Sequence, residues 1–322
     1  MPLITAPDNL REAFLLAARG KSSKEEVRRF RENLDENLLR MAEELNAATY
    51  DFSKYRQFMV YEPKPRVINA APFVTRVALQ AMMRVCHNVF DDFQIFDSYA
   101  SRVGKGTYKA LERARQYARR YRWFAKLDVK SYFASIDHYV MMRMLCRLFK
   151  DNVLLENFQN IIDSYSVEPH KGLPIGNLSS QYFANHYLSV ADRYAKSNGV
   201  KAMVRYMDDV LFFGDDKSLL IRQMNGYAKF VTSELLLKLH VPVINKTHHG
   251  VPFLGYVIYG DKMRLNANSR RRFRRRMGMM CESVDTNSLP DDMYNANFVA
   301  MLSFVQKADS LGFRKKVFGM LS

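Results

Sequence analysis

Residues 204–216 decide the fold, and they read V-R-Y-M-D-D-V-L-F-F-G-D-D. Two adjacent carboxylates, Asp208 and Asp209, lie between an aromatic lead-in and an apolar run at residues 210–213 that is typical of a buried strand. An unpaired carboxylate in a protein interior is costly, so something must compensate these two. A tight hairpin with both acids at its turn, facing divalent metal, would do so, and a solvated Asp-Asp turn is the alternative.

The composition indicates a folded protein with a polyanionic partner. The chain has 322 residues, and 48% of them are hydrophobic, which is enough for a sizeable core. Its 49 Lys and Arg against 33 Asp and Glu give a net charge of +16, which favours nucleic acid first and an anionic membrane surface second. No apolar segment approaches the roughly 20 residues that span a bilayer, and no signal-peptide pattern opens the chain. We therefore expect a cytoplasmic protein without a membrane partner.

The cysteines and histidines predict neither a disulfide nor a metal site. Cys86, Cys146 and Cys281 lie far apart, are odd in number and form no C-x-x-C pair, so reduced thiols are expected. His248 and His249 are adjacent, which is poor spacing for chelating one ion, and a polar loop is the simpler interpretation.

The first 125 residues are expected to be mostly helical, with one hairpin. Residues 5–46 carry apolar positions at helical spacing and predict an N-terminal helical segment over residues 1–48. Residues 50–69 change to a hairpin pattern around a Pro-bounded turn that carries Lys64 and Arg66. Two cations on a stiff tip can close on phosphates, and a solvated loop explains them equally well.

A glycine-rich basic turn interrupts the next helical region. Residues 72–93 and 107–120 show helical patterns, and residues 98–106 between them read S-Y-A-S-R-V-G-K-G. A lone G-x-G is weak evidence for phosphate binding. We interpret Arg102 and Lys105 as contacts to a nucleic-acid backbone.

A second acidic anchor lies at residues 123–138, which read W-F-A-K-L-D-V-K-S-Y-F-A-S-I-D-H. An apolar strand delivers Asp128 at its end, where it would be held firmly yet stay open to substrate, whereas capping of the following helix is the alternative. Together with Asp208 and Asp209 it predicts a two-metal centre, because that chemistry needs carboxylates gathered from separate strands.

The order of motifs along the chain resembles that of reverse transcriptases over roughly residues 55–259. The motifs are K-L-D-V-K-S-Y-F, then G-L-P-I-G-N-L-S-S-Q at residues 172–181, R-Y-M-D-D-V, N-K-T at residues 245–247 and F-L-G-Y at residues 253–256. The resemblance implies an α+β right-hand polymerase with fingers, a palm built on an antiparallel sheet, and a short helical thumb. It implies Mg²⁺-dependent synthesis of DNA from dNTPs on a template RNA, starting from a cDNA primer end.

The resemblance also implies subdomain boundaries. The fingers would take residues 49–125 with a helical insertion at 140–171, the palm residues 126–139 and 172–260, and a basic thumb residues 261–322. No nuclease or maturase-like extension is expected after the thumb, so target cleavage would come from elsewhere.

Catalytic roles carry over to the matching residues. Asp128, Asp208 and Asp209, with the backbone carbonyl of Val129, match the ligands of two Mg²⁺ ions, for which Mn²⁺ can substitute. Lys246 matches a lysine suited to protonating the pyrophosphate as it leaves.

Substrate contacts carry over in the same way. Lys64 and Arg66 match the cations that grip the triphosphate. Phe133 matches the bulky residue under the incoming sugar, where a ring would clash with a 2′-hydroxyl, so deoxynucleotides should be preferred and an RNA-dependent RNA polymerase is disfavoured. The hairpin that contacts the primer end, the primer grip, matches four residues: Phe253, Leu254, Gly255 and Tyr256.

Residues 173–181 narrow the resemblance. Many reverse transcriptases have Gln-Gly at the place of Ile175 and Gly176, and proline at the place of Gln181. The I-G-x-x-x-S-Q form resembles the enzymes of diversity-generating retroelements, which copy a template-repeat RNA with errors at adenines. Loss of an amide beside the nascent base pair agrees with that direction, because it removes a hydrogen-bond restraint on the nucleotide. Retron, group II intron and antiphage reverse transcriptases share the other motifs and remain alternatives, as does a catalytically silent nucleic-acid-binding scaffold.

Residues 269–277, S-R-R-R-F-R-R-R-M, form a basic block that cannot be buried. Binding of phosphates with release of counterions is its natural use. The expected backbone contacts are Arg270, Arg271, Arg272, Arg274, Arg275 and Arg276. The resemblance further implies a small basic oligomeric accessory protein as partner and a bacterial or phage origin.

Overall fold

The computed structural model describes residues 1–61, 65–285 and 291–319, without the side chains of residues 283–285 and 291–294. Within it the chain divides into two compact units, each built from three segments. The first unit comprises Met1–Phe96, Val129–Gly199 and Gly226–His240. The second unit comprises Asp97–Asp128, Val200–Asn225 and Val241–Ser322. The helix α10 (Lys217–Ser233) begins in the second unit and ends in the first.

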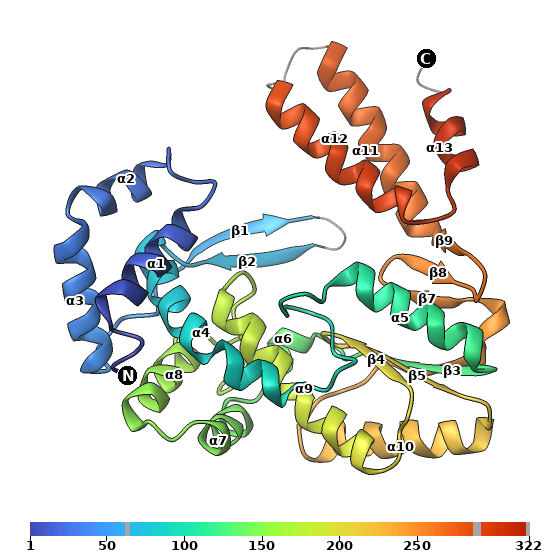
Figure 1. Cartoon of the computed structure of the whole chain (residues 1–322), viewed down its shortest axis with the longest axis horizontal. Coiled ribbons are helices and arrows are strands. Elements are labelled where there is room, and N and C mark those ends of the chain that lie inside the picture. Colours follow the sequence, from blue (N-terminus) through green and yellow to red (C-terminus); the bar gives the residue numbers. More distant parts are fainter. Residues whose placement is uncertain (62–64, 286–290, 320–322) are drawn as a thin grey trace. The chain divides into compact units, whose positions relative to one another are not determined.

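The first unit is a helical assembly with one two-stranded hairpin (Figure 1). The single N-terminal helical run expected from the sequence is three helices, because Gly20 turns the chain with φ +70° and Asn33 takes a non-helical conformation. Rings of Phe14, Phe30 and Phe73 pack together with centroids 5.5–5.9 Å apart and tie these helices to α4. Its elements are α1 (Pro7–Ala18), α2 (Glu25–Glu32), α3 (Leu34–Asn46), β1 (Arg56–Val60), β2 (Arg66–Ala70), α4 (Phe73–Phe93), α6 (Tyr132–Ser135), α7 (His138–Leu148), α8 (Asn152–Asp163) and α9 (Leu178–Ser197).

The second unit is built on a four-stranded antiparallel sheet in the order β4-β5-β3-β6. Its strands are β3 (Trp123–Leu127), β4 (Met203–Tyr206), β5 (Asp209–Gly214) and β6 (Val243–Lys246). The predicted apolar strands on either side of the acidic pair are confirmed as β4 and β5, and the strand before Asp128 is confirmed as β3. The sheet carries the three aspartates singled out in the sequence.

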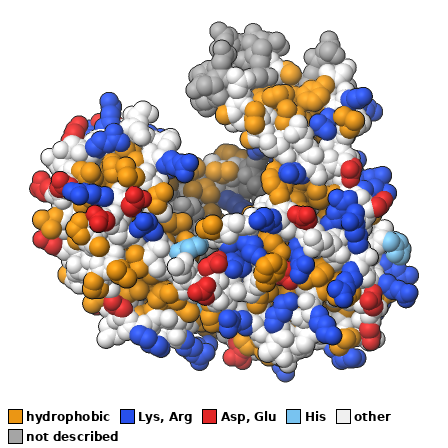
Figure 2. Space-filling model, in the orientation of Figure 1, with side chains coloured by type: hydrophobic (Ala, Val, Ile, Leu, Met, Phe, Trp, Pro, Cys, Tyr) orange, Lys and Arg blue, Asp and Glu red, His pale blue; other side chains and the backbone are white. Residues whose placement is uncertain are grey.

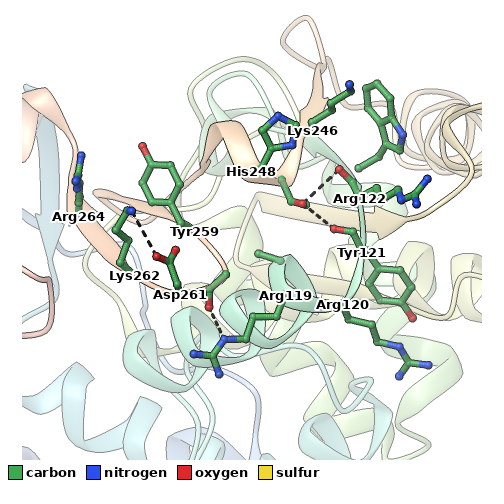
Figure 3. A pocket seen from close by; sticks show the side chains of 14 residues that line it. Arg119, Arg120, Tyr121, Arg122, Lys246, His248, Tyr259, Asp261, Lys262 and Arg264 are labelled. Atoms are coloured by element: carbon green, nitrogen blue, oxygen red, sulfur yellow. Dashed lines mark hydrogen bonds and ion pairs between the residues drawn. The ribbon is translucent and has the colours of Figure 1, made fainter.

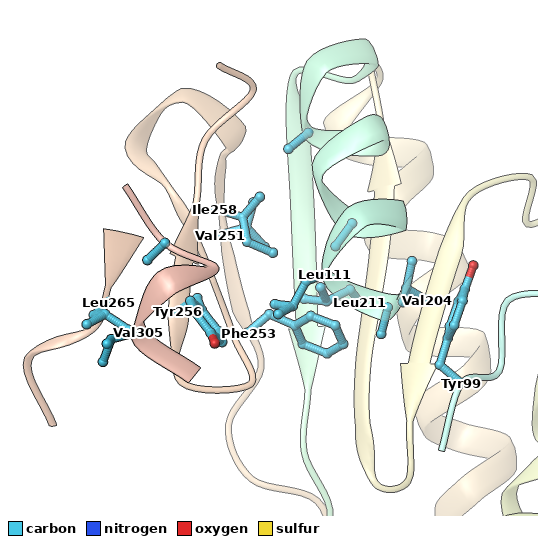
Figure 4. Close-up of a cluster of buried hydrophobic side chains, with 14 of the residues drawn as sticks. Tyr99, Leu111, Val204, Leu211, Val251, Phe253, Tyr256, Ile258, Leu265 and Val305 are labelled. Atoms are coloured by element: carbon cyan, nitrogen blue, oxygen red, sulfur yellow. The ribbon is translucent and has the colours of Figure 1, made fainter. Parts of the chain in front are cut away.

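A three-stranded antiparallel sheet and four helices complete the second unit. Side chains of the larger sheet, of α5 and of the smaller sheet meet in one buried cluster that includes Leu111, Leu211 and Phe253 (Figure 4). The predicted hairpin at residues 253–256 is confirmed as the turn between β7 and β8. The remaining elements are α5 (Thr107–Arg120), the 3₁₀ helix η1 (Thr247–His249), β7 (Val251–Phe253), β8 (Tyr256–Ile258), β9 (Met263–Leu265), α11 (Ala267–Asp285), α12 (Asp291–Gln306) and α13 (Leu311–Phe318).

Two expectations about composition are also answered. Cys86, Cys146 and Cys281 are all free thiols, as predicted. None of the described helices combines the length and the apolar character that a bilayer crossing requires.

Candidate active site

The turn between β4 and β5 presents the acidic pair. Tyr206 pairs with Asp209, so Met207 and Asp208 are the two turn residues. Met207 has φ +53°, a left-handed conformation that is unfavourable for a residue with a side chain. The fully buried Arg205 braces it, because its Nη1 donates to the carbonyl of Met207 at 3.1 Å. The predicted tight hairpin is therefore confirmed, and a buried arginine holds it.

The register of β3 against β5 brings the third aspartate to this turn. Leu127 pairs with Val210, so Asp128 follows β3 at the same edge where Asp209 begins β5. Both Asp128 and Asp208 raise the pKa of Asp209 through their charges. The structure thus places the three predicted carboxylate ligands at one edge of the sheet in the second unit.

Lys126 is a fourth member of this cluster that sequence reasoning missed. Its Nζ lies 3.0 Å from Oδ1 of Asp209 and donates to Oδ2 at 3.1 Å. Oδ1 accepts no hydrogen bond from any described residue, although it lies within ion-pair distance of the lysine. Lys126 and Asp128 are two residues apart, and side chains two apart on a strand share a face. That spacing was the available signal.

The electrostatics of the cluster favour a cation. Burial raises the pKa of Asp209 to about 6, Lys126 opposes the shift, and Asp128 and Asp208 add to it. Three carboxylates beside one lysine leave excess negative charge, and carboxylate oxygens are the donors that Mg²⁺ prefers. Oδ1 of Asp209, which accepts no hydrogen bond of good geometry from the described residues and has only the Lys126 ammonium 3.0 Å away, fits such an ion. In the part of the chain that the structure describes, no three His, Cys, Asp or Glu are already gathered at ligand distance, so closing on an ion needs side-chain movement.

Lys246 lies at the opposite end of β3 from the aspartates. It pairs with Trp123, whereas Asp128 is five residues further along, roughly 16 Å at the rise of an extended strand. Its Nζ lies 5.6 Å from the centre of the Trp123 ring. This position gives no support to the predicted role of Lys246 in protonating pyrophosphate.

The residues expected under the nucleotide belong to the first unit. The carbonyl of Phe133 accepts from the N–H of Leu173 at 2.8 Å, which fixes the loop before α9 against α6. Gln181 lies in the first turn of α9 and is half-buried. Val129 bridges to Leu239 in the same unit.

The Ile175–Gly176 turn rests on the strand that begins at Arg66. The carbonyl of Ile175 accepts from the N–H of Asn69 at 2.8 Å. A Cβ on Gly176, whose φ is +115°, would lie 2.8 Å from Cγ2 of Ile68. Glycine is thus needed for the close approach of this turn to β2. The first unit therefore places the turn against the strand that begins at Arg66, a residue predicted to bind the triphosphate. Lys64 lies outside the described residues.

Comparison with known proteins identifies the family. Residues 62–258 match the family model described as "Reverse transcriptase (RNA-dependent DNA polymerase)", which is more than half of the chain. The chain belongs to the reverse transcriptase family. The residues assigned from the family motifs lie mostly inside the matched region.

Individual relatives of this reverse transcriptase are distant. It is 20% identical over 166 residues to a putative COX1/OXI3 intron 1 protein from Saccharomyces cerevisiae, a match that covers 49% of this chain and 20% of that protein. An apo telomerase structure from Candida tropicalis has a TM-score of 0.52 at 10% identity, covering 68% of this chain and 49% of that one. A telomerase structure from Candida albicans, in complex with a TWJ fragment of telomeric RNA, has a TM-score of 0.52 at 11% identity, covering 71% and 51%. The chain thus spans about a fifth of the curated relative and about half of the telomerase chains. Its likeness to the telomerase structures confirms the predicted α+β polymerase fold.

The hairpin predicted to be the primer grip uses its glycine inside its own unit. Leu254 and Gly255 form the turn, with φ +47° and +88°. A Cβ on Gly255 would lie 2.9 Å from Oγ of Ser269 and 3.1 Å from Cζ of Phe304. The Gly255 carbonyl accepts from that Ser269 hydroxyl at 2.8 Å. Phe253 and Tyr256 on either side are buried, as is Ser269 of α11, whereas Phe304 of α12 is half-buried, and contact with a primer stays a prediction.

The predicted backbone-binding cations of the reverse transcriptase differ in exposure. Arg102 donates to the carbonyl of Ser98 at 3.1 Å, and Nζ of Lys105 lies 5.1 Å from the Tyr99 ring centre. In α11 the buried Phe273 forms the inner stripe with its neighbours four residues away. Arg272 is half-buried, and the other five arginines of the block, Arg270, Arg271, Arg274, Arg275 and Arg276, are exposed.

Proposed function

We propose that this chain is an RNA-directed DNA polymerase whose chemistry takes place at Asp128, Asp208 and Asp209. The observation that carries the proposal is the half-buried Asp209 carboxyl, which Lys126 contacts and whose pKa is raised to about 6 beside two further carboxylates, in a chain of the reverse transcriptase family. Perturbed carboxylates cluster where proteins hold catalytic cations or protons. The telomerase neighbour that was solved with RNA supports template RNA as the partner.

Within this proposal the three aspartates would hold two Mg²⁺ ions, with Mn²⁺ as a substitute. When bound, such ions activate the primer 3′-hydroxyl and stabilise charge on the leaving pyrophosphate. Lys126 donates a hydrogen bond to Oδ2 of Asp209. It thereby orients that carboxyl group and opposes the rise of its pKa. Arg66 and Lys64 would bind the triphosphate, and Phe133 would exclude a 2′-hydroxyl.

Extension of a DNA primer on an RNA template tests the proposal. Purified protein in Mg²⁺ should add dNTPs, and Asp208→Ala should abolish the addition while the protein stays folded. Wild type and Phe133→Ala should differ in their preference for dNTPs over ribonucleotides, since the ring is the sugar filter. Equal extension by wild type and Asp208→Ala would refute the proposal.

We further propose the diversity-generating retroelement type, with a template-repeat RNA, error-prone copying at adenines and mutagenic retrohoming as the role. The support is Ile175 and Gln181 at positions that are commonly polar and proline in the family. A small basic oligomeric accessory protein and a cytoplasmic bacterial or phage setting belong to the same proposal.

Sequencing cDNA made from a defined RNA tests this finer assignment. Errors should concentrate opposite template adenines, and Ile175→Gln should reduce them by restoring an amide beside the nascent pair. A flat, low error spectrum in wild type would favour a retron-like or antiphage reverse transcriptase instead.

A further inference from the structure

A basic cavity of about 980 Å³ lies in the second unit, where α5 ends and β3 begins (Figure 3). Figure 2 shows Lys and Arg side chains gathered along the right-hand edge of the view. Among the described residues that line the cavity, Asp261 is the one carboxylate, and it pairs with Lys262 at 3.4 Å. The basic lining residues are Arg119, Arg120, Arg122, Lys246, Lys262 and Arg264.

Hydrogen bonds between distant segments hold this cavity in shape. Oγ1 of the buried Thr247 donates to the carbonyl of Tyr121 at 2.7 Å, and its N–H donates to the carbonyl of Arg122 at 2.9 Å. Nε of Arg119 donates to the carbonyl of Gly260. The N-K-T motif therefore fixes Lys246 beside the start of β3, and the β8–β9 turn is fixed to α5.

Four of the cations are available for an anion. Arg120, Arg122, Lys246 and Arg264 are exposed, and none forms an ion pair with a carboxylate of the described chain. A guanidinium group can donate two hydrogen bonds to phosphate oxygens, and a cluster of cations without carboxylate partners is the electrostatic pattern of a nucleic-acid site. A surface of scattered, solvated lysines would not enclose a cavity.

Aromatic rings among the cations, of which Trp123 and Tyr259 are two, indicate which polyanion fits. Trp123 and Tyr259 are half-buried lining residues, and Arg264 lies 5.9 Å from the Tyr259 ring centre. Gly250 backs the Tyr259 ring so closely that a Cβ there would lie 2.9 Å from it. Rings between cations suit a single strand, whose bases stack while its phosphates are neutralised. An acidic protein segment would use the cations without the rings.

We propose that this cavity binds a single-stranded nucleic-acid segment outside the polymerisation site. It lies at the start of β3, roughly 16 Å along the strand from Asp128. Exposed phosphates contact Arg120 and Arg264, and a base stacks on Tyr259. The site does not depend on polymerase chemistry, because its residues are separate from the aspartates.

Fluorescence anisotropy with labelled 12-nucleotide single strands tests the proposal. Oligouridylate RNA and oligothymidylate DNA are titrated with the full chain in chelator, so that no synthesis occurs. The test variant is Arg120→Glu/Arg264→Glu, and the control is Lys24→Glu/Arg28→Glu on the exposed face of the N-terminal helices, which changes the net charge equally. Circular dichroism checks the folding of each variant.

The test pair should weaken binding at least 10-fold and lower the salt-dependence slope by about 1.4, as expected for two lost phosphate contacts. The control pair should change affinity less than 2-fold. Tyr259→Leu, which keeps the bulk over Gly250, should weaken binding of both strands about 10-fold without changing the slope. A 4-thiouridine strand should crosslink to the peptide that contains Tyr259.

The two probes also separate the sources of the strand. Tighter binding of oligouridylate assigns the cavity to template RNA, and tighter binding of oligothymidylate assigns it to displaced cDNA. Equal losses in test and control pairs would overturn the proposal and leave a solvated basic face. Competition by polyglutamate as strong as by oligouridylate, with no effect of Tyr259→Leu, would overturn it in favour of an acidic protein.

Discussion

The two ends of β3 differ in charge and in burial. Carboxylates lie at one end, where Asp209 is half-buried, and exposed cations lie at the other. After Leu127 the strand delivers Asp128 to a cluster in which Asp209 is half-buried and its pKa is raised to about 6. At Trp123 it opens into a cavity in which four cations are exposed and form no ion pair with a carboxylate of the described residues. Buried charge is unstable until an ion or proton joins it, whereas exposed charge binds a polymer by releasing counterions. The comparison shows how one strand can hold a candidate catalytic site at one end and a candidate nucleic-acid-binding surface at the other.

The largest effect should come from breaking the acidic end. Asp128→Asn removes one carboxylate that would hold the ions, and several kcal/mol of transition-state stabilisation correspond to a loss of roughly 1,000-fold in rate. Single-turnover primer extension measures it. Glu112→Gln, an exposed neutralisation on α5, should stay within 2-fold of wild type. A loss below 5-fold for Asp128→Asn would mean that the acidic end is not catalytic.

The next largest effect is the pH dependence of the free energy of unfolding, measured in the presence of a chelator so that no divalent cation is bound. The folded state holds the Asp209 proton more tightly, because burial raises the carboxyl pKa from 3.8 to about 6. Its contribution to the free energy of unfolding is therefore present below pH 4 and is lost as the pH rises through 6. The side chain is only 19% exposed, so we expect a loss of about 3 kcal/mol from this group.

Urea unfolding at pH 4.5 and 7.5 measures this loss, and Asp209→Asn is the comparison. The asparagine variant should gain about 2 kcal/mol relative to wild type as the pH is raised between these values. Parallel pH profiles for the two proteins would show that burial does not perturb the carboxyl.

The basic end of β3 can be perturbed by substituting Gly250, which lies directly behind the Tyr259 ring. In Gly250→Ala the new Cβ would lie 2.4 Å from Cγ1 of Val257 and 2.9 Å from the Tyr259 ring, at φ +94°. Gly104→Ala is the matched control, because Gly104 has φ +71° and nothing within 4 Å of a Cβ. Overpacking should make Gly250→Ala less stable than the control by about 2 kcal/mol in urea unfolding. Equal losses would mean that the ring moves freely.

The smallest effect sharpens the role of the lone lysine at the acidic end. Lys126→Gln leaves the Asp209 carboxylate without its partner, which should lower the free energy of unfolding by about 1.5 kcal/mol at pH 8 after allowance for partial exposure. At pH 5 the cost should shrink, because Asp209 is then mostly protonated. Lys315→Gln, an exposed lysine of α13, should change stability little at either pH. A cost that does not depend on pH would assign Lys126 a packing role.

Local sequence predicted the acidic end of β3 well. The run R-Y-M-D-D-V predicted a tight hairpin between two apolar segments, and the structure differs only in that Asp208 lies in the turn while Asp209 begins β5. The boundaries of α5 were also predictable, since Gly106 precedes the helix and its apolar positions repeat at helical spacing. The polymerase motifs then assigned fold and family.

The relation between the two ends could not be predicted from local sequence. The place of Lys246 depends on the antiparallel register of β6 with β3, which is set by packing between segments more than 100 residues apart. Residues 5–46 were predicted to be helical, which α1, α2 and α3 confirm, whereas the breaks at Gly20 and Asn33 are local turns that the apolar repeat does not reveal. The fingers, palm and thumb boundaries stay a prediction, since the two compact units follow contacts and not motifs.

Binding of Mn²⁺ tests the central claim most directly, because the claim is that the acidic end of β3 holds divalent cations. Electron paramagnetic resonance of free Mn²⁺ is recorded as protein is added, with template, a chain-terminated primer and an incoming dNTP present. Wild type should remove the free-ion signal saturably, and Asp208→Asn/Asp209→Asn should need at least 10-fold more protein. Identical titrations for the two proteins would contradict the account.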